Sequence, residues 1–256
     1  MIDPRAEVAP SSRIGPGVEI GPFSVIGPDV QIGARSRIGS HVVIEGPTRI
    51  GTDNALHSFS SFGGPPQDKK FEGEVTELII GDRNTIREFC TFNRGTRQGG
   101  GVTRIGNDNW IMAYVHIAHD CMVGRNVTMA NGATLAGHVE VADFVTLGAF
   151  TVVHQFCSIG CHAFTAMGTV VFKDVPPYVT ASGNSASPHG INTEGLRRHE
   201  FTPVAIRALR QAYKTVYRKG LTMEQAIEAL GGLPDEEQVL TPLVSFLRRS
   251  SRGIIR

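Results

Sequence analysis

Aliphatic residues recur at every sixth position along the first two-thirds of the chain. From Val8, a step of six meets only Val or Ile as far as Ile50, and Gly directly follows most of these residues. The register continues to Phe92, shifts by one residue, and resumes from Ile105 to Ile159. Because an α-helix has a period of 3.6 residues and a single strand a period of two, a period of six fits neither.

This period predicts a solenoid with a triangular cross-section. Each six-residue unit combines a short β-branched strand with a Gly-containing turn, and so makes one flat face. Three faces close one coil, and the coils stack in parallel at the inter-strand spacing of ~4.8 Å. The aliphatic residue of each unit points inward. We therefore expect a parallel β-helix over residues 1–178.

Two segments interrupt the repeat. Residues 63–76 (GGPPQDKKFEGEVT) lack the aliphatic spacing and predict a loop that leaves the solenoid. Residues 97–103 are Gly-rich and coincide with the shift of register, which predicts a second loop. Binding and catalytic residues concentrate in loops on a rigid scaffold. The alternative for each loop is an insertion that the solenoid merely tolerates.

Residues 179–256 have a different composition and predict a connecting loop followed by a small α-helical domain. Thr202, followed by Pro, has the features of an N-cap, and helical spacing then runs to Gly220, which we expect to be the C-cap. Thr222 begins a capping box and opens a second short helix. We expect a third helix over residues 236–249.

Charge and composition exclude several classes of protein. The 256 residues carry 25 Lys+Arg and 24 Asp+Glu, a formal net charge of +1, which does not favour a nucleic-acid partner. No apolar run is long enough to span a membrane. The first ten residues lack the basic patch and apolar stretch of a signal peptide. We therefore expect a cytoplasmic protein, with its four cysteines reduced and mostly buried.

Polar residues form a column on one outer face of the predicted solenoid. His119 and His138 differ by one coil plus one residue, so they should project from the same face on adjacent rungs. Gln155 lies two coils beyond His119, with His154 beside it, and His116 precedes His119 by three residues. These residues should therefore reach a common ligand.

Three interpretations of this column remain open from the residues alone. An outward histidine is most often a solvated surface residue. His116, His119 and His138 could instead hold a zinc ion, with water in the fourth position, as in a hydratase resembling carbonic anhydrase. The third interpretation is acid–base chemistry by a neutral imidazole, with Asp120 beside His119.

The chain resembles the UDP-N-acetylglucosamine O-acyltransferase family over nearly its whole length. The motifs that carry the resemblance are His116–Cys121, Asn131–Val139, His154–Cys157, Gln67–Lys70, Ile80–Asn84, Asn93–Thr96, Asp174–Tyr178, Asn192–Arg198 and Arg252–Gly253. The hexapeptide-repeat acyltransferases, which the [LIV]-G-x4 signature also resembles, imply that the parallel β-helix is left-handed, a feature that spacing alone does not give.

The resemblance implies a homotrimer with active sites between subunits. It also implies transfer of a 3-hydroxyacyl group from acyl carrier protein to the 3-hydroxyl of UDP-N-acetylglucosamine, the first step of lipid A biosynthesis, without a metal or other cofactor. His119 matches the general base, Asp120 would orient it, and the Gly137 N–H would face the oxyanion. The positions that match substrate-binding residues are Asp68, Lys70, His116, His138, His154, Gln155, Asn192, Glu194 and Arg198.

Three positions depart from the family pattern or set its specificity. Asn93 stands where the family often has His, and His199 stands where it often has Arg. Met167 falls at the position that measures acyl length, where Gly admits longer chains, and predicts a donor of about ten to twelve carbons. Met167 is two-thirds of a coil away in azimuth from His119, so it would reach the acyl chain across a subunit boundary or along a bent chain. The alternative is that it packs into the core.

Other functions on the same fold make different predictions. The related N-acyltransferases carry a large N-terminal uridine-binding domain, for which repeats that begin at Val8 leave no room. A zinc hydratase predicts bound metal. A non-catalytic trimeric scaffold predicts that His119 is dispensable.

Overall fold

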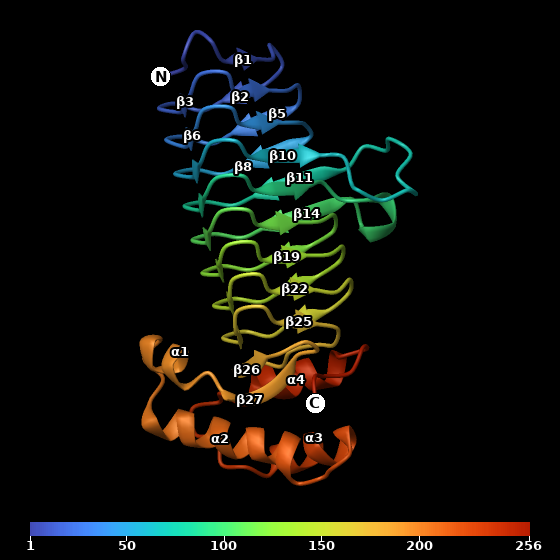
Figure 1. Ribbon diagram of the computed structural model, residues 1–256. Helices are drawn as coiled ribbons and strands as arrows, with labels where there is room; N and C mark the ends of the chain where they lie inside the picture. The colour runs from blue at the N-terminus through green and yellow to red at the C-terminus, as the bar shows by residue number, and fades with distance from the viewer.

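A computed structural model describes all 256 residues as a left-handed parallel β-helix that ends in a small helical region (Figure 1). Three parallel sheets form the faces of the prism. Sheet A has ten strands, β3 (Glu19–Ile20), β6 (Arg37–Ile38), β9 (Ala55–Leu56), β12 (Thr85–Ile86), β15 (Trp110–Ile111), β18 (Thr128–Met129), β21 (Thr146–Leu147), β24 (Phe164–Thr165), β26 (Val179–Ser182) and β27 (Ser187–Ile191). Sheet B has nine, β1 (Glu7–Val8), β4 (Val25–Ile26), β7 (Val43–Ile44), β10 (Ser61–Gly64), β13 (Thr91–Asn93), β16 (His116–Ile117), β19 (Thr134–Leu135), β22 (Val152–Val153) and β25 (Val170–Val171). Sheet C has eight, β2 (Arg13–Ile14), β5 (Val30–Ile32), β8 (Thr48–Ile50), β11 (Glu77–Ile80), β14 (Val102–Ile105), β17 (Met122–Val123), β20 (Glu140–Val141) and β23 (Ser158–Ile159).

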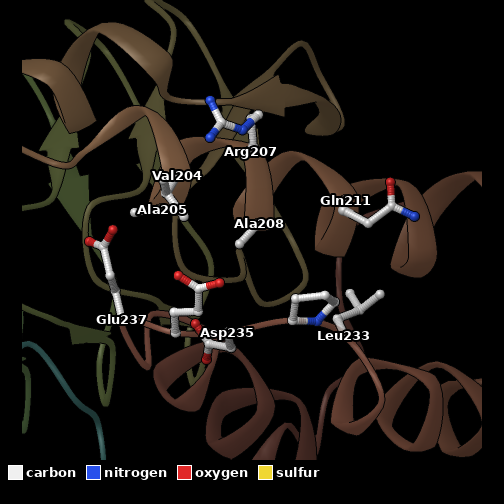
Figure 2. Close-up of a pocket in the computed structure, with 10 residues that line it drawn as sticks. Val204, Ala205, Arg207, Ala208, Gln211, Leu233, Asp235 and Glu237 are labelled. Atoms are coloured by element: carbon white, nitrogen blue, oxygen red, sulfur yellow. The ribbon is translucent and has the colours of Figure 1, made fainter.

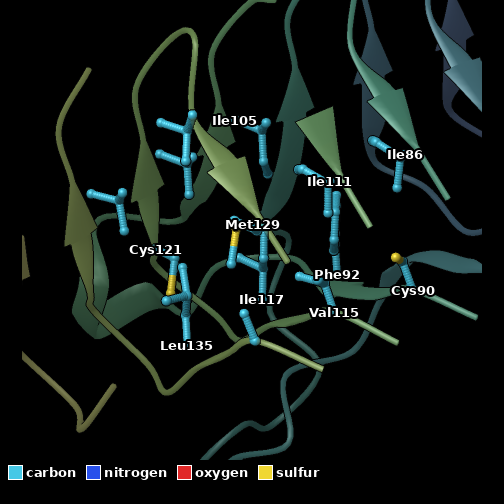
Figure 3. Packing of buried hydrophobic residues seen from close by; sticks show 14 of the residues in the cluster. Ile86, Cys90, Phe92, Ile105, Ile111, Val115, Ile117, Cys121, Met129 and Leu135 are labelled. Atoms are coloured by element: carbon cyan, nitrogen blue, oxygen red, sulfur yellow. The ribbon is translucent and has the colours of Figure 1, made fainter. Parts of the chain in front are cut away.

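The predicted inward positions form the core. Forty buried residues make one continuous hydrophobic cluster along the prism axis. Figure 3 shows part of it, where Ile86 and Ile111 from sheet A and Phe92, Ile117 and Leu135 from sheet B meet inside the coils. Burying these aliphatic side chains supplies the main stabilisation of the fold, because each removes apolar area from water.

A second inward position, two residues before each aliphatic, holds valine at many rungs and a small or polar side chain at others, and several of the polar side chains are hydrogen-bonded. Ser24 Oγ donates to the Gly39 carbonyl at 2.7 Å. Further along, Asn84 Nδ2 donates to Asn54 Oδ1 at 3.0 Å, and Asn109 Oδ1 accepts from the Val127 N–H at 2.7 Å. Such buried amides are tolerated only when they are hydrogen-bonded.

Two loops leave the prism at the same corner. We call the turns that connect sheet B to sheet C the loop corner. The first loop was predicted over 63–76, but Gly63 and Gly64 belong to β10, so the inserted residues are 65–76, between β10 and β11. Since β11 still pairs with β8, this loop lengthens one turn between two faces and adds no coil. The second insertion lies between β13 and β14 and contains the 3-10 turn η1 (Arg97–Gly99). Both loops project on one side of the molecule (Figure 1).

The C-terminal region has four helices, α1 (Thr193–Arg198), α2 (Pro203–Arg218), α3 (Met223–Gly231) and α4 (Thr241–Arg249). The predicted N-cap at Thr202 and the capping box at Thr222 are confirmed. Lys219 caps α2 instead of the expected Gly220, which follows it with φ +65°.

The predicted helix over 236–249 begins only at Thr241. The carboxylate of Asp235 accepts the N–H groups of Val239 and Leu240 and holds the preceding residues in turns. The sequence analysis missed the short helix α1. It also missed the antiparallel pair β26–β27, which continues sheet A into the C-terminal region. No helix has the length and apolar character that a membrane crossing requires.

Candidate active site

The loop corner brings His119 and Asp120 together as a buried pair. They follow strand β16, and Asp120 adopts φ +61°, the left-handed conformation that recurs at this corner. His119 Nδ1 lies 2.8 Å from Asp120 Oδ2, and the two residues are only 7% and 6% exposed. When Asp120 accepts from Nδ1–H, the other ring nitrogen, Nε2, is left free as a base.

His138 stands directly on the next rung, as predicted. Its ring meets the His119 ring edge-on at 5.1 Å, and its Nε2 lies 3.6 Å from Asp120 Oδ2. Its other face stacks on Phe156 at 4.5 Å. Burial is the main cause that lowers the pKa of His138, and His119 adds to this lowering. The negative charges of Asp120 and Asp68 oppose it. The ring therefore favours the neutral form.

Gly137 lies beneath the His119 ring. A Cβ at this position would lie 2.5 Å from His119 Cε1 and 2.7 Å from Nε2, so only glycine lets the ring rest there. The N–H of Gly137 takes no part in the backbone hydrogen bonds between coils. A free backbone donor thus lies beside the atom that would act as base, as an oxyanion site requires.

His116 is separate from this cluster. It lies within β16 on the outer surface of sheet B, and its Nδ1 lies 2.7 Å from Thr91 Oγ1. Burial lowers the pKa of His116, a hydrogen bond with the Thr91 backbone opposes this, and His119 adds to the lowering.

The structure changes the set of residues that could hold a metal. His119, Asp120 and His138 offer one ligand atom each within 4.8 Å of one another, whereas His116 is not part of this group. The alternative of a zinc site on His116, His119 and His138 is therefore not supported, because His116 lies apart from the other two.

The rung after His138 carries His154 and Gln155. Gln155 is half-buried and stands one coil after Gly137, since the Phe156 N–H donates to the Gly137 carbonyl. His154 is exposed, and its Nδ1 lies 3.4 Å from Arg252 Nη2. The C-terminal segment thus returns to the loop corner and adds the cation Arg252. The sequence analysis gave this residue no role beyond its place in a motif.

The first loop brings Asp68 and Lys70 to the same corner. Asp68 is close enough to His138 to raise its pKa, and its carboxylate accepts the Lys70 N–H at 3.0 Å. Asn93, where the family often has histidine, is 7% exposed and donates from Nδ2 to the Pro65 carbonyl at 2.9 Å. Its amide therefore anchors the first loop.

The remaining predicted residues lie at other corners. Asn192 caps α1 and donates to the His162 carbonyl at 3.0 Å, where sheet C turns into sheet A. Glu194 and Arg198 lie on the same short helix and are exposed. His199 packs edge-on against His162, at 5.2 Å between ring centroids.

Met167 follows β24, where sheet A turns into sheet B, and is 76% exposed. The alternative that Met167 packs into the core is therefore wrong. A single chain brings neither Met167 nor the α1 residues to His119.

Two cavities differ in their relation to these residues. A groove of about 570 Å³ runs from Asp120 and His138 over Phe156 to Arg249 of α4. A second pocket, of about 250 Å³, lies between α2 and the loop before α4 and contains none of the predicted site residues. Figure 2 shows its lining, Val204, Ala205, Arg207, Ala208, Gln211, Leu233, Asp235 and Glu237.

Family comparisons match both parts of the chain. The family described as "UDP N-acetylglucosamine O-acyltransferase; Domain 2" matches residues 174–255. The family "Bacterial transferase hexapeptide (six repeats)" matches residues 11–46 and 103–137.

Individual relatives cover most of the chain. An acyl-[acyl-carrier-protein]–UDP-N-acetylglucosamine O-acyltransferase of a Janthinobacterium species is 58% identical over 80% of this chain and 79% of its own. A protein of the same name from Thiobacillus denitrificans is 56% identical over 79% of each chain. The solved UDP-N-acetylglucosamine acyltransferase of Francisella novicida superposes with a TM-score of 0.97 at 44% identity, covering 100% of this chain and 94% of that one. The enzyme of Moraxella catarrhalis gives 0.96 at 42% identity, covering 100% of this chain and 99% of that one.

Proposed function

The chain belongs to the UDP-N-acetylglucosamine O-acyltransferase family and is an acyltransferase, and on that premise we propose its substrates and mechanism. It transfers a 3-hydroxyacyl group from acyl carrier protein to the 3-hydroxyl of UDP-N-acetylglucosamine, the first step of lipid A biosynthesis, in the cytoplasm. The donor and acceptor are those in the names of its relatives. The observation that carries the mechanism is the buried His119–Asp120 pair with the Gly137 backbone beneath Nε2.

His119 acts as the general base. Its Nε2 takes the proton of the sugar 3-hydroxyl as that oxygen attacks the thioester carbonyl carbon, and Asp120 stabilises the imidazolium that forms. The Gly137 N–H donates to the carbonyl oxygen as it becomes an oxyanion. The tetrahedral intermediate then breaks its C–S bond, and the carrier's thiolate leaves with the proton from the imidazolium. The neutral character of His138 and His116 suits them to hydrogen-bond sugar hydroxyls.

Three copies of the chain complete the site. Asp68, Lys70, His154 and Gln155 join His119 at the loop corner. The α1 residues lie instead by the corner where sheet C turns into sheet A, and Met167 lies at the corner where sheet A turns into sheet B. A homotrimer in which the sheet A side of one subunit faces the loop corner of the next brings these groups together. Asn192, Glu194 and Arg198 then bind the nucleotide and its diphosphate, for which a guanidinium is suited.

Mass analysis of products tests the activity. The protein is incubated with UDP-N-acetylglucosamine and acyl carrier proteins that bear 3-hydroxyacyl chains of about 10, 12 and 14 carbons. We expect acylated nucleotide in the presence of EDTA as well as without it. Absence of any acylated nucleotide contradicts the proposed reaction, and loss of activity only with EDTA points to a metal on His119, Asp120 and His138.

The same panel tests Met167, which we propose limits the acyl chain from a neighbouring subunit. Wild type should prefer the chains of about ten to twelve carbons, and Met167→Gly should raise the relative rate with the longest donor about tenfold. An unchanged donor profile in the variant, or a wild-type preference for the longest donor, would retire this role.

A further inference from the structure

The second loop closes on the carboxylate of Asp120. Thr96, at the start of this loop, donates twice to it: its N–H to Oδ1 at 2.8 Å and its hydroxyl to Oδ2 at 2.6 Å. Oδ2 also accepts from His119 Nδ1 at 2.8 Å. Thr96 is 2% exposed, so the three groups form one buried chain of hydrogen bonds, Thr96–Asp120–His119.

The turn that follows Thr96 is shaped to this contact. Thr96 is the N-cap of η1, and its hydroxyl oxygen accepts the Gly99 N–H at 3.1 Å while the hydroxyl proton points to Asp120. A Cβ on Gly99 would overlap the Asp120 carboxylate, so the turn can close only with glycine there. At the far end of the loop, Thr103 Oγ1 accepts the Asp120 N–H at 2.8 Å.

The other left-handed residues of the loop corner lack such a clamp. Asp29, Asp120 and His138 occupy equivalent positions there, yet only the side chain of Asp120 accepts hydrogen bonds from an inserted loop. The insertion displaces Thr96 from the regular spacing and sets it at the height of Asp120, which it precedes by 24 residues. A tolerated insertion would need no buried bonds to the site.

We infer that Thr96 is a positioning residue for acyl transfer. Its two donors fix the plane of the Asp120 carboxylate, which fixes the ring of His119 with the proton on Nδ1 and the lone pair of Nε2 above Gly137. Buried carboxylates require hydrogen-bond donors, and a shift of about 1 Å in a catalytic group can cost about 10²-fold in rate. This inference rests on the proposed function for its kinetic test.

Variants at Thr96 separate positioning from folding. Thr96→Val keeps the shape and the backbone donor but removes the hydroxyl, Thr96→Ser restores it, and Gln98→Ala is the control on an exposed residue of the same turn. We expect Thr96→Val to lower kcat about 10- to 100-fold without raising KM for the sugar nucleotide. Thr96→Ser and Gln98→Ala should stay within about threefold of wild type. A Thr96→Val enzyme with wild-type kcat, or a loss that appears only in KM, overturns the inference.

Coupling to Asp120 provides a second kinetic test. Because Thr96 acts through the carboxylate, adding Thr96→Val to Asp120→Asn should cause little further loss, whereas independent roles would multiply the two effects. Multiplied effects count against the inference.

A measurement without substrate keeps this inference distinct from the proposed reaction. Nitrogen-15 NMR of the intact protein should show His119 as the single Nδ1–H tautomer in wild type and Thr96→Ser. In Thr96→Val it should show a mixture of tautomers. An unchanged single tautomer in Thr96→Val would overturn the inference even if the acyltransferase assay succeeded, and the mixture would support it even if the tested donors were wrong.

Discussion

Two corners of the prism share the left-handed backbone conformation but place side chains of different kinds there. Where sheet C turns into sheet A, Arg35, Asp53, Arg83 and Asp108 have φ between +56° and +59° on successive rungs. They form the ion pairs Arg35–Asp53 at 2.6 Å and Arg83–Asp108 at 2.7 Å. We call this the ion-pair corner. At the loop corner, Asp120 has φ +61° in the equivalent position but is buried.

The difference lies in how each polar group is satisfied. At the ion-pair corner each charge meets its partner on the neighbouring rung, in water, and such exposed pairs contribute little to stability. At the loop corner Asp120 meets an inserted segment that excludes water and supplies donors from Thr96. The regular repeat therefore builds the scaffold, and the proposed catalytic pair is buried where the repeat is interrupted.

The largest expected effect comes from removing His119, the proposed base at the loop corner. His119→Ala should lower kcat by about 10²–10⁴, the usual contribution of general base catalysis, without loss of the folded state. Steady-state kinetics with circular dichroism measure this, and His41→Ala, on an exposed rung near the N-terminal end, is the matched control. Activity of His119→Ala within threefold of wild type would show that His119 is not the general base.

Gly137→Ala should have the next largest effect. The new Cβ would displace the His119 ring from its place above residue 137, and we expect kcat to fall about 10²-fold. Gly231→Ala, at a helical glycine whose Cβ would meet nothing within 4 Å, is the control and should be neutral. Equal kinetics of the two variants would mean that the ring does not need this site.

We expect an effect of pH on stability from the C-terminal rungs of the ion-pair corner, where aromatic rings replace the charged side chains. His162 stacks between Phe144 at 4.7 Å and Tyr178 at 5.8 Å. Burial is the main cause that lowers the pKa of His162 to about 4; His199 adds to the lowering and Asp143 opposes it. The unfolded chain therefore binds this proton at higher pH than the folded chain, and stability falls as the pH drops from about 6.5 to about 4.

His162→Phe should keep the ring stack and remove the part of the pH dependence of stability that comes from protonation of His162. Between pH 6.5 and 4.5 we expect the variant to lose less stability than wild type, by about 1 kcal/mol once solvent screening of the partly exposed ring is allowed for, with similar stability at pH 7. Urea unfolding at fixed protein concentration measures the difference. Parallel pH profiles for the two proteins would show that His162 is not the group responsible.

The smallest effect belongs to the exposed ion pairs. Arg35→Ala should leave both the melting temperature and kcat unchanged within experimental error, because Arg35 is solvent-exposed. Differential scanning calorimetry and the acyl-transfer assay check this. A clear loss of either would show that the regular rungs contribute more to the site than their exposure indicates.

Much of the site could be predicted because the coil length converts sequence distance into position. His119, Gly137 and Gln155 stand above one another for this reason, and His138 meets His119 as expected. The expectation that His116 joins this cluster was wrong, because His116 is a strand residue on the face of sheet B and not a corner residue. Thr96 was missed because the inserted loop changes the number of residues in its coil, so its position does not follow from sequence distance.

By itself, the sequence determined the solenoid, its inward aliphatic positions and the column of polar residues, because a period of six admits one way of burying the aliphatic side chains. Only the tertiary structure decided that both insertions leave at one corner, that the second closes on Asp120, and that α1 and Met167 lie elsewhere. The physical reason is that inserted loops and short helices have no repeat to fix their position. They are placed by the individual hydrogen bonds and ring contacts that they find.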